Sequence, residues 1–243
     1  MQILYDIRRR ARHRAVTFAS TRPTLYYGLR RATGTFDELC ITSDTDLVIE
    51  GYPRSANSTT VHGFLDRQPE PVKVAHHKHH AAQLLRAVER GLPAVMLIRE
   101  PVVASLSNLA LAEEAVRHGG GRRRGTIGYT EALAGWLAFY RALLPHLDSL
   151  VVAPFDQVTT DIDAMIEAVN THFGTAFAAG PPLRIREKPL GWHATPNPMR
   201  EDIKRDLHAG FDRALERSAR LRAMMDEASE LHREVIARHE RRH

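Results

Sequence analysis

Short apolar runs alternate with segments of helical spacing along most of the chain. Compact apolar runs bounded by turn residues are typical of buried strands, and they occur at residues 46–50, 72–75, 94–99 and 150–153. Apolar positions three or four residues apart are typical of helices, and they occur at residues 59–65, 81–90, 102–117, 129–147 and 161–173. This alternation predicts an α/β fold, a three-layer parallel sheet with helices on both faces.

The two ends of the chain have a different pattern. Residues 1–45 form a basic lead-in that we expect to be helical to about Gly34. Near the other end, apolar residues recur every four positions, at Ile203, Leu207, Phe211 and Leu215. This spacing predicts one long C-terminal helix, or two, packed on the domain, with a homodimer interface as the alternative. We expect a single domain of 243 residues, with an α/β core at 46–174 and a C-terminal loop and helix at 175–243.

The chain carries a formal net charge of +5. Its basic residues gather at 8–14, 122–124, 184–188 and 238–242. Such clusters indicate either a solvated basic surface or a partner rich in phosphate or sulfate. The sequence has neither zinc-finger spacing nor an aromatic RNA-recognition run, so a nucleic acid is not the expected partner.

The cysteine content and the apolar runs bear on location. Cys40 is the one cysteine, which suits a reducing compartment. No apolar run is long enough for a transmembrane segment or a signal peptide. The sequence therefore predicts a cytoplasmic protein.

A turn-rich loop at residues 51–58 joins a predicted strand to a predicted helix. It has the length and first glycine of the phosphate-binding pattern G-x-x-x-x-G-K-[ST], but Ala56 replaces the second glycine and Asn57 replaces the lysine. Backbone N–H groups and the helix dipole favour an anion at such a turn, and Arg54 adds positive charge. Hydroxyl donors are present at Ser55, Ser58, Thr59 and Thr60. The missing lysine counts against a kinase or ATPase, and the alternative is a polar turn that binds nothing.

A second candidate anion site follows the strand at 94–99. Arg99 ends this strand, and ligands of open α/β sheets bind at the carboxyl ends of strands. Pro101 suits the first turn of the next helix, and Ser107 lies about two turns further on, where its hydroxyl can flank a phosphate held by Arg99. The alternative is that Arg99 pairs with a carboxylate and Ser107 is a surface residue.

These motifs resemble those of the sulfotransferases that use 3′-phosphoadenosine 5′-phosphosulfate. Their first signature, P-[KR]-S-G-[TN]-[TS] after a strand, is similar to PRSANS at 53–58, and their second, R-[DNE]-P-x-x-x-x-x-S, is similar to residues 99–107. A weaker similarity to their strand ending in Y-E-D-L occurs at 151–158, where we expect Phe155 and Asp156 to be structural. The resemblance covers about residues 46–174 and implies a P-loop NTPase-like fold.

The resemblance also implies roles for the candidate residues. It assigns the 5′-phosphosulfate to Arg54, Ser55, Ala56, Asn57, Ser58 and Thr59, and the 3′-phosphate to Arg99 and Ser107. Family members place a catalytic histidine just after the second strand, so His76, or His77 after a shift of one residue, is the implied base. Arg54 would stabilise the leaving phosphate. This scheme requires no metal. A zinc site is the rival interpretation of the histidines at 76–80, which have neither a nearby cysteine nor a four-ligand spacing.

The sequence thus predicts an enzyme that moves a sulfonate to a hydroxyl of a small-molecule, carbohydrate or lipid acceptor, with an amine as second choice. The alternatives are a P-loop kinase or nucleotide hydrolase, and a non-catalytic module that binds a nucleotide or polyanion. Candidate acceptor loops are 119–125 and 184–197. The family's later basic element would correspond to Arg184, Arg186 or Lys188, and its adenine-stacking aromatic is replaced by Thr59 or Thr60.

Overall fold

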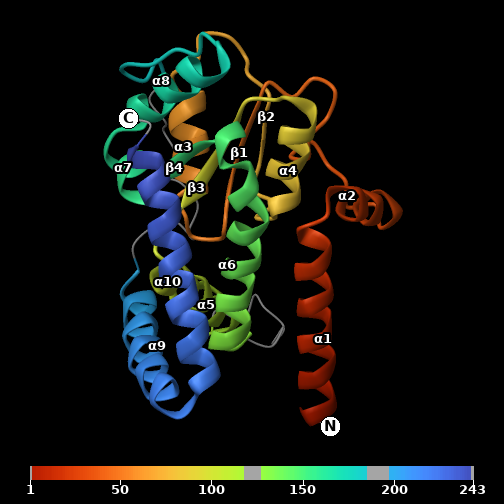
Figure 1. The fold of residues 1–243 in the computed structure, drawn as a ribbon, viewed down its shortest axis with the longest axis vertical. Helices are drawn as coiled ribbons and strands as arrows, with labels where there is room; N and C mark the ends of the chain where they lie inside the picture. Colours follow the sequence, from red (N-terminus) through yellow and green to blue (C-terminus); the bar gives the residue numbers. More distant parts are fainter. Residues whose placement is uncertain (1, 118–126, 185–196, 242–243) are drawn as a thin grey trace.

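A computed structural model of the chain describes residues 2–117, 127–184 and 197–241, with side chains from residue 10 onward. In this part of the chain, four parallel strands form one sheet in the order β2-β1-β3-β4 (Figure 1). The strands are β1 (Leu47–Gly51), β2 (Val74–His76), β3 (Ala94–Ile98) and β4 (Val151–Pro154). They lie within one or two residues of the predicted strands, and the α/β class with a parallel sheet is confirmed.

Helices cover both faces of the sheet, because alternate residues of each strand point to opposite sides. Val48, Met96 and Val152 belong to the core on one face, against α4 (Ala81–Arg90), α6 (Tyr129–Leu143) and α10 (Ala219–Glu240). Ile49, Val95 and Val151 belong to the core on the other face, against α3 (Asn57–Leu65), α7 (Phe155–Thr160) and α8 (Ile162–Phe173). The order of the strands puts the ends of β1 and β3 side by side at the centre of the sheet.

The basic lead-in consists of two helices, α1 (Gln2–Ser20) and α2 (Pro23–Ala32). The break falls at Pro23, which suits the first turn of a helix but cannot continue an earlier one, because it has no backbone N–H. The ring nitrogen Nε2 of His13 lies 3.0 Å from the carbonyl oxygen of Glu131, which joins α1 to α6. Tyr26 and Tyr27 bury the inner face of α2 in the main core.

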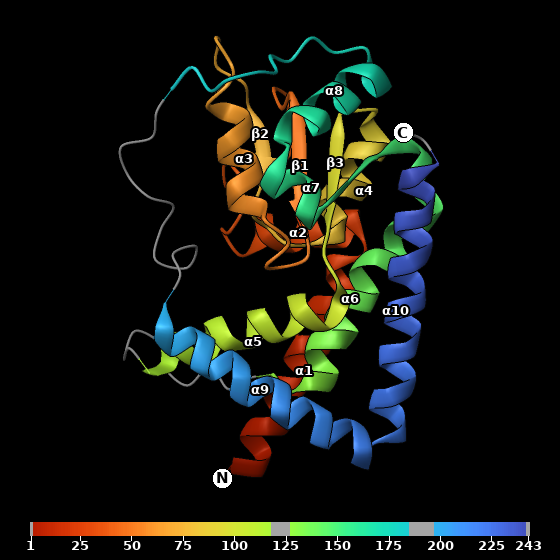
Figure 2. The same cartoon turned by 90° about the vertical axis from the view of Figure 1, so that its left-hand side faces the viewer.

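The C-terminal stripe also forms two helices, α9 (Pro198–Arg217) and α10. They meet at Ser218, whose hydroxyl caps α10 by accepting a hydrogen bond of 3.1 Å from Leu221 N. Helix α9 packs on α5 (Pro101–Arg117), and Figure 2 shows both running across the molecule below the sheet. A buried ion pair of 2.5 Å between Arg200 Nε and Glu114 Oε2 joins them.

Two predicted boundaries were wrong. The helix expected over 129–147 ends at Leu143 and continues as a 3-10 helix, η1 (Leu144–Ser149), because Pro145 has no N–H for an α-helical bond. The segment 155–160, expected as the end of a strand and the approach to the next helix, is the helix α7. It begins directly after Pro154, so Phe155 lies at the carboxyl edge of the sheet.

Candidate functional site

The loop after β1 turns tightly between the sheet and α3. A Cβ atom on Gly51 would lie 2.7 Å from the carbonyl oxygen of Leu97, so β1 can approach β3 this closely only with glycine at that position. Arg54 and Ala56 have positive φ angles of 73° and 69°. Ala56 thus adopts the left-handed conformation that glycine favours, at the position where the phosphate-binding pattern has its second glycine. Because α3 begins at Asn57, its first N–H groups point toward this turn.

Two arginines that follow neighbouring strands meet beside this turn. Arg54 Nε donates a hydrogen bond of 3.1 Å to Ser107 Oγ on α5, and Arg99 Nη1 donates one of 3.0 Å to the carbonyl oxygen of Arg54. The Arg99 guanidinium also stacks 3.8 Å from the centre of the Phe155 ring. Burial lowers the pKa of both arginines, and the charges of Arg200 and Arg99 lower that of Arg54 further. A bound anion would offset this cost of burying positive charge.

These groups line a pocket of about 460 Å³ at the carboxyl edge of the sheet. The predicted site residues that line it are Arg54, Ala56, Asn57, Ser58, Thr59, His77, Arg99 and Ser107. Ser55 is not among the lining residues: it is fully buried and its hydroxyl lies 3.5 Å from that of Tyr140. His76 is not among them either. Asn57 Oδ1 is a buried oxygen with no hydrogen-bond partner in the described residues.

The histidines after β2 reach the pocket through a strained loop. His77 and His79 have positive φ angles of 56° and 55°, which non-glycine residues rarely adopt. His77 Nε2 lies 2.8 Å from Ser58 Oγ, and its Nδ1 lies 2.5 Å from Nδ1 of His76. Burial lowers the pKa of His76 to about 4, helped by the neighbouring positive charge of Lys78. His76 is therefore neutral at neutral pH, behind His77 as seen from the pocket.

Glu50 holds this histidine loop, and the sequence analysis missed it. Its carboxylate accepts hydrogen bonds from the backbone N–H groups of Lys78 and His79, at 2.6 Å and 3.0 Å. The side chain is fully buried. Burial raises its pKa to about 7, although hydrogen bonds from Lys78, His79 and Gln83 act in the opposite direction. The available signal was an acidic residue inside an otherwise apolar strand, which a buried polar role explains.

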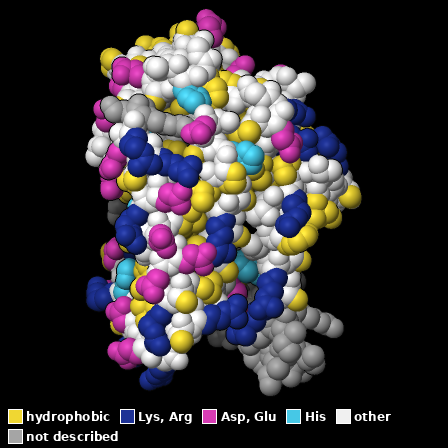
Figure 3. Space-filling view, in the orientation of Figure 1, with side chains coloured by type: hydrophobic (Ala, Val, Ile, Leu, Met, Phe, Trp, Pro, Cys, Tyr) yellow, Lys and Arg dark blue, Asp and Glu magenta, His cyan; other side chains and the backbone are white. Residues whose placement is uncertain are grey.

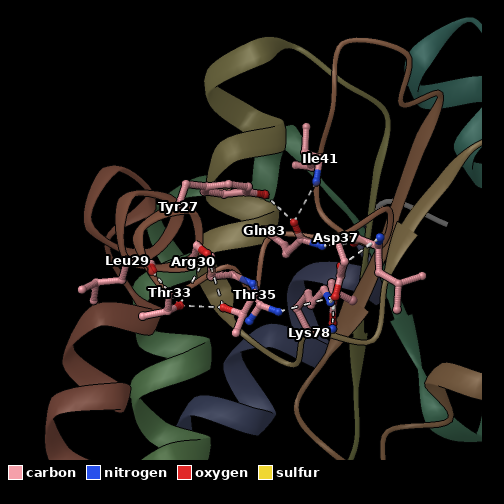
Figure 4. Close-up of polar contacts among 11 residues, drawn as sticks. Tyr27, Leu29, Arg30, Thr33, Thr35, Asp37, Ile41, Lys78 and Gln83 are labelled. Carbon is pink, nitrogen blue, oxygen red and sulfur yellow. Dashed lines mark hydrogen bonds and ion pairs between the residues drawn. The ribbon is translucent and has the colours of Figure 1, made fainter.

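A network from α2 continues behind the same loop (Figure 4). Gln83 Oε1 accepts hydrogen bonds from the Tyr27 hydroxyl and from Ile41 N, the latter at 3.2 Å. Lys78 Nζ lies 2.5 Å from a carboxylate oxygen of Asp37. The backbone of His76 is fixed as well, by a hydrogen bond of 3.1 Å from its N–H to the carbonyl oxygen of Leu39. The segment that follows α2 therefore holds the histidine loop from the side opposite the pocket.

The pocket has further lining residues that were not predicted as site residues. They are Pro53, His79, Asn108, Leu111, Phe155, Thr159 and Lys204. Lys204 is brought in by α9, far along the chain, and only packing of α9 on α5 places it there. Of the predicted basic element, Arg184 bonds through its backbone N–H to Asp66 O, 3.2 Å away, and is not a lining residue. Arg186, Lys188 and the loop at 119–125 lie outside the described residues.

Comparison with known proteins adds no family: no protein-family model, no curated protein and no solved structure matches the chain. Within the described ranges, no helix has the length and apolar character needed to cross a bilayer. The same ranges contain no group of three or more His, Cys, Asp or Glu side chains arranged to hold a metal ion. The pocket itself is therefore the feature of the structure that bears on function.

Proposed function

We propose that the chain is a sulfotransferase with a P-loop NTPase-like core, which moves a sulfonate from 3′-phosphoadenosine 5′-phosphosulfate to a hydroxyl acceptor. The observation that carries the proposal is the composition of one pocket. A helix N-terminus, two arginines from neighbouring strands, and a histidine that contacts a serine of the phosphate loop all line it. The donor carries two separate anionic groups, and the two clusters of donors, at residues 54–59 and at Arg99 and Ser107, suit them.

In the proposed reaction, an acceptor oxygen attacks the sulfur and its proton passes to His77 Nε2. The bond between sulfur and the bridging oxygen breaks, and its electron pair stays on the 5′-phosphate. Arg54 and the N–H groups at the start of α3 stabilise that developing charge. We favour His77 over His76 as the base because His77 lines the pocket. A neutral His76 can accept the Nδ1 proton of His77, which leaves the His77 Nε2 lone pair facing Ser58.

The same contact counts against a magnesium-dependent kinase or hydrolase. Such enzymes place the hydroxyl at the position of Ser58 on the metal and a loop lysine on the phosphates. Here Ser58 Oγ is engaged by His77, and Asn57 occupies the position of the lysine.

Thermal melts with nucleotides test the proposal. Adenosine 3′,5′-bisphosphate should stabilise the protein more than AMP, or than ATP with magnesium, because only the bisphosphate can occupy both anion sites. At 100 times its dissociation constant, a ligand adds about 2.7 kcal/mol to the free energy of unfolding. Equal shifts with AMP and the bisphosphate would contradict a 3′-phosphate site, and a larger shift with magnesium ATP would favour the kinase alternative.

A further inference from the structure

The two N-terminal helices carry a charge unlike that of the remaining chain. Residues 7–36 contain eight arginines and no aspartate or glutamate. Subtracting these eight charges from the net charge of +5 leaves the remainder of the chain at −3. The positive charge of this protein is therefore concentrated in α1 and α2 and the short segment that follows them.

Exposed apolar side chains gather on the same helices. Phe18 is 55% exposed and Leu29 is 47% exposed, with Val16 and Leu25 close behind. Outside α1 and α2, the large apolar side chains exposed in the described residues are Val103, Leu183 and Met199. Figure 3 shows apolar and basic side chains next to one another at the right-hand edge of the molecule, where Figure 1 places α2 and the end of α1.

The two helices dock on the protein by one face, and the mixed surface lies beside the docked face, where Arg14 and Phe18 line a pocket next to α6. His13 contacts α6, and Tyr26 and Tyr27 are buried. On this surface a basic and an apolar side chain are in direct contact: the Arg22 guanidinium lies 3.5 Å from the centre of the Phe18 ring. We call this surface the N-terminal basic face and define it by Arg14, Phe18, Arg22, Leu25 and Leu29, all of them exposed.

The combination of exposed arginines and apolar side chains indicates the chemistry of the binding partner. A nucleic acid would pair with the arginines but leave the leucines in water, and an apolar protein surface would do the reverse. The surface of an anionic bilayer accepts both, with phosphates at the headgroup level and acyl chains just below. We propose that the N-terminal basic face docks on membranes that contain anionic phospholipid. The proposal does not depend on the activity of the pocket.

Sedimentation of the full chain with lipid vesicles tests the proposal. Vesicles of phosphatidylcholine are compared with vesicles that also contain phosphatidylglycerol, at low and at high salt. The wild type should bind the anionic vesicles at low salt and dissociate from them at high salt. In R14Q/R22Q the partition should fall about 25-fold, because each basic residue near an anionic surface contributes about fivefold. The matched control R205Q/R217Q removes equal charge from exposed positions of α9 and should bind as the wild type does.

A second pair of variants tests the apolar part. Phe18→Ser with Leu29→Ser should weaken vesicle binding, whereas Val103→Ser with Met199→Ser, also exposed, should not. Thermal melts of every variant without ligand report that it is folded, independently of lipid. Absence of wild-type binding to anionic vesicles, equal binding to neutral ones, or equal loss in both charge variants would overturn the proposal. Binding to duplex DNA but not to vesicles, or a dimer abolished by the Phe18 and Leu29 changes, would do so too.

Discussion

The loops that follow β1 and β2 lie at the same edge of the sheet and meet where Ser58 contacts His77, but they are held in different ways. The loop after β1 is fixed by close packing, since Gly51 allows no Cβ atom against Leu97. Arg54, Asn57 and Ser58 of this loop line the pocket, next to the first N–H groups of α3. The loop after β2 is fixed by the protein's own polar groups, because Glu50 accepts two of its backbone N–H groups.

This difference separates two tasks. A loop that presents the N–H groups of a helix start is suited to binding an anion. A loop whose polar groups are already satisfied from within is suited to holding one side chain in place. Both loops contain two residues with positive φ, Arg54 and Ala56 in the first and His77 and His79 in the second, and strain of this kind persists only where the surroundings impose it. The comparison predicts that changes in the first loop affect ligand binding and changes in the second affect rate.

Replacement of His77 should have the largest effect. We choose His77→Asn, because asparagine tolerates a positive φ better than alanine does. Loss of a general base should lower the rate of donor hydrolysis by about 10²–10⁴-fold, with bisphosphate binding unchanged. His76→Ala should have a smaller effect, and His80→Ala, which packs on Tyr26 at 5.0 Å and does not line the pocket, serves as the control. A larger loss of hydrolysis rate in His76→Ala than in His77→Asn would indicate that His76 is the base. Inhibition by a chelator would favour a metal site.

Glu50→Gln should change how stability depends on pH. Burial raises the pKa of Glu50 from 4.5 to about 7, so the folded protein binds this proton more tightly than the unfolded chain. Between pH 4.5 and 7, the contribution of Glu50 to the free energy of unfolding of the wild type therefore falls as pH rises, by on the order of 3 kcal/mol. The variant lacks this fall, so its stability relative to wild type should rise from pH 4.5 to 7.

Urea unfolding at several pH values measures the effect. His76 and His80 act in the opposite sense, because burial lowers the pKa of each to about 4 and their contribution increases with pH up to about 6.5. That contribution is common to both proteins and cancels in the difference between them. A difference that is constant from pH 4.5 to 7 would show that Glu50 is ionised throughout.

Arg99→Ala should remove the preference for the bisphosphate over AMP. A charged hydrogen bond contributes on the order of 1.5–3 kcal/mol, and Arg99 lies beside the phosphate loop through its bond to Arg54. Calorimetric titration with both nucleotides measures the change. A loss of the same factor for AMP and the bisphosphate would indicate that Arg99 supports the loop rather than a second phosphate.

Local patterns gave much of the fold in advance. The helix 81–90 matches its predicted bounds, and Gly91 ends it with a positive φ of 63°, because apolar spacing and a glycine stop are both local signals. The α/β class followed from the alternation of strands and helices. The break before Pro23 and the helix α7 were not predicted, although proline is the local cause in the first case.

The candidate site was predictable only where a local sequence motif marks its residues. Arg99 lies next to the loop at 51–58 because both follow adjacent parallel strands, which the strand-end rule anticipates. Glu50 and Lys204 carried no motif. Their roles depend on which distant backbone or helix packs beside them, and a single sequence does not contain that information in local form. The choice between His76 and His77 likewise depends on a turn with positive φ.

The smallest expected effect is a gain in stability from Ala56→Gly. Ala56 has a φ of 69°, a left-handed conformation that costs roughly 1–2 kcal/mol for a residue with a Cβ atom. Glycine removes that cost but adds freedom to the unfolded chain, which takes back about 0.4–1 kcal/mol. The net expectation is a stabilisation of about 0.5–1 kcal/mol with bisphosphate binding preserved, measured by urea unfolding. Ala112→Gly is the matched control, because Ala112 is exposed in the right-handed helix α5 and glycine there should destabilise by about 1 kcal/mol. If both changes destabilise the protein equally, residue 56 is right-handed in solution and the turn is not built like a glycine-containing phosphate loop.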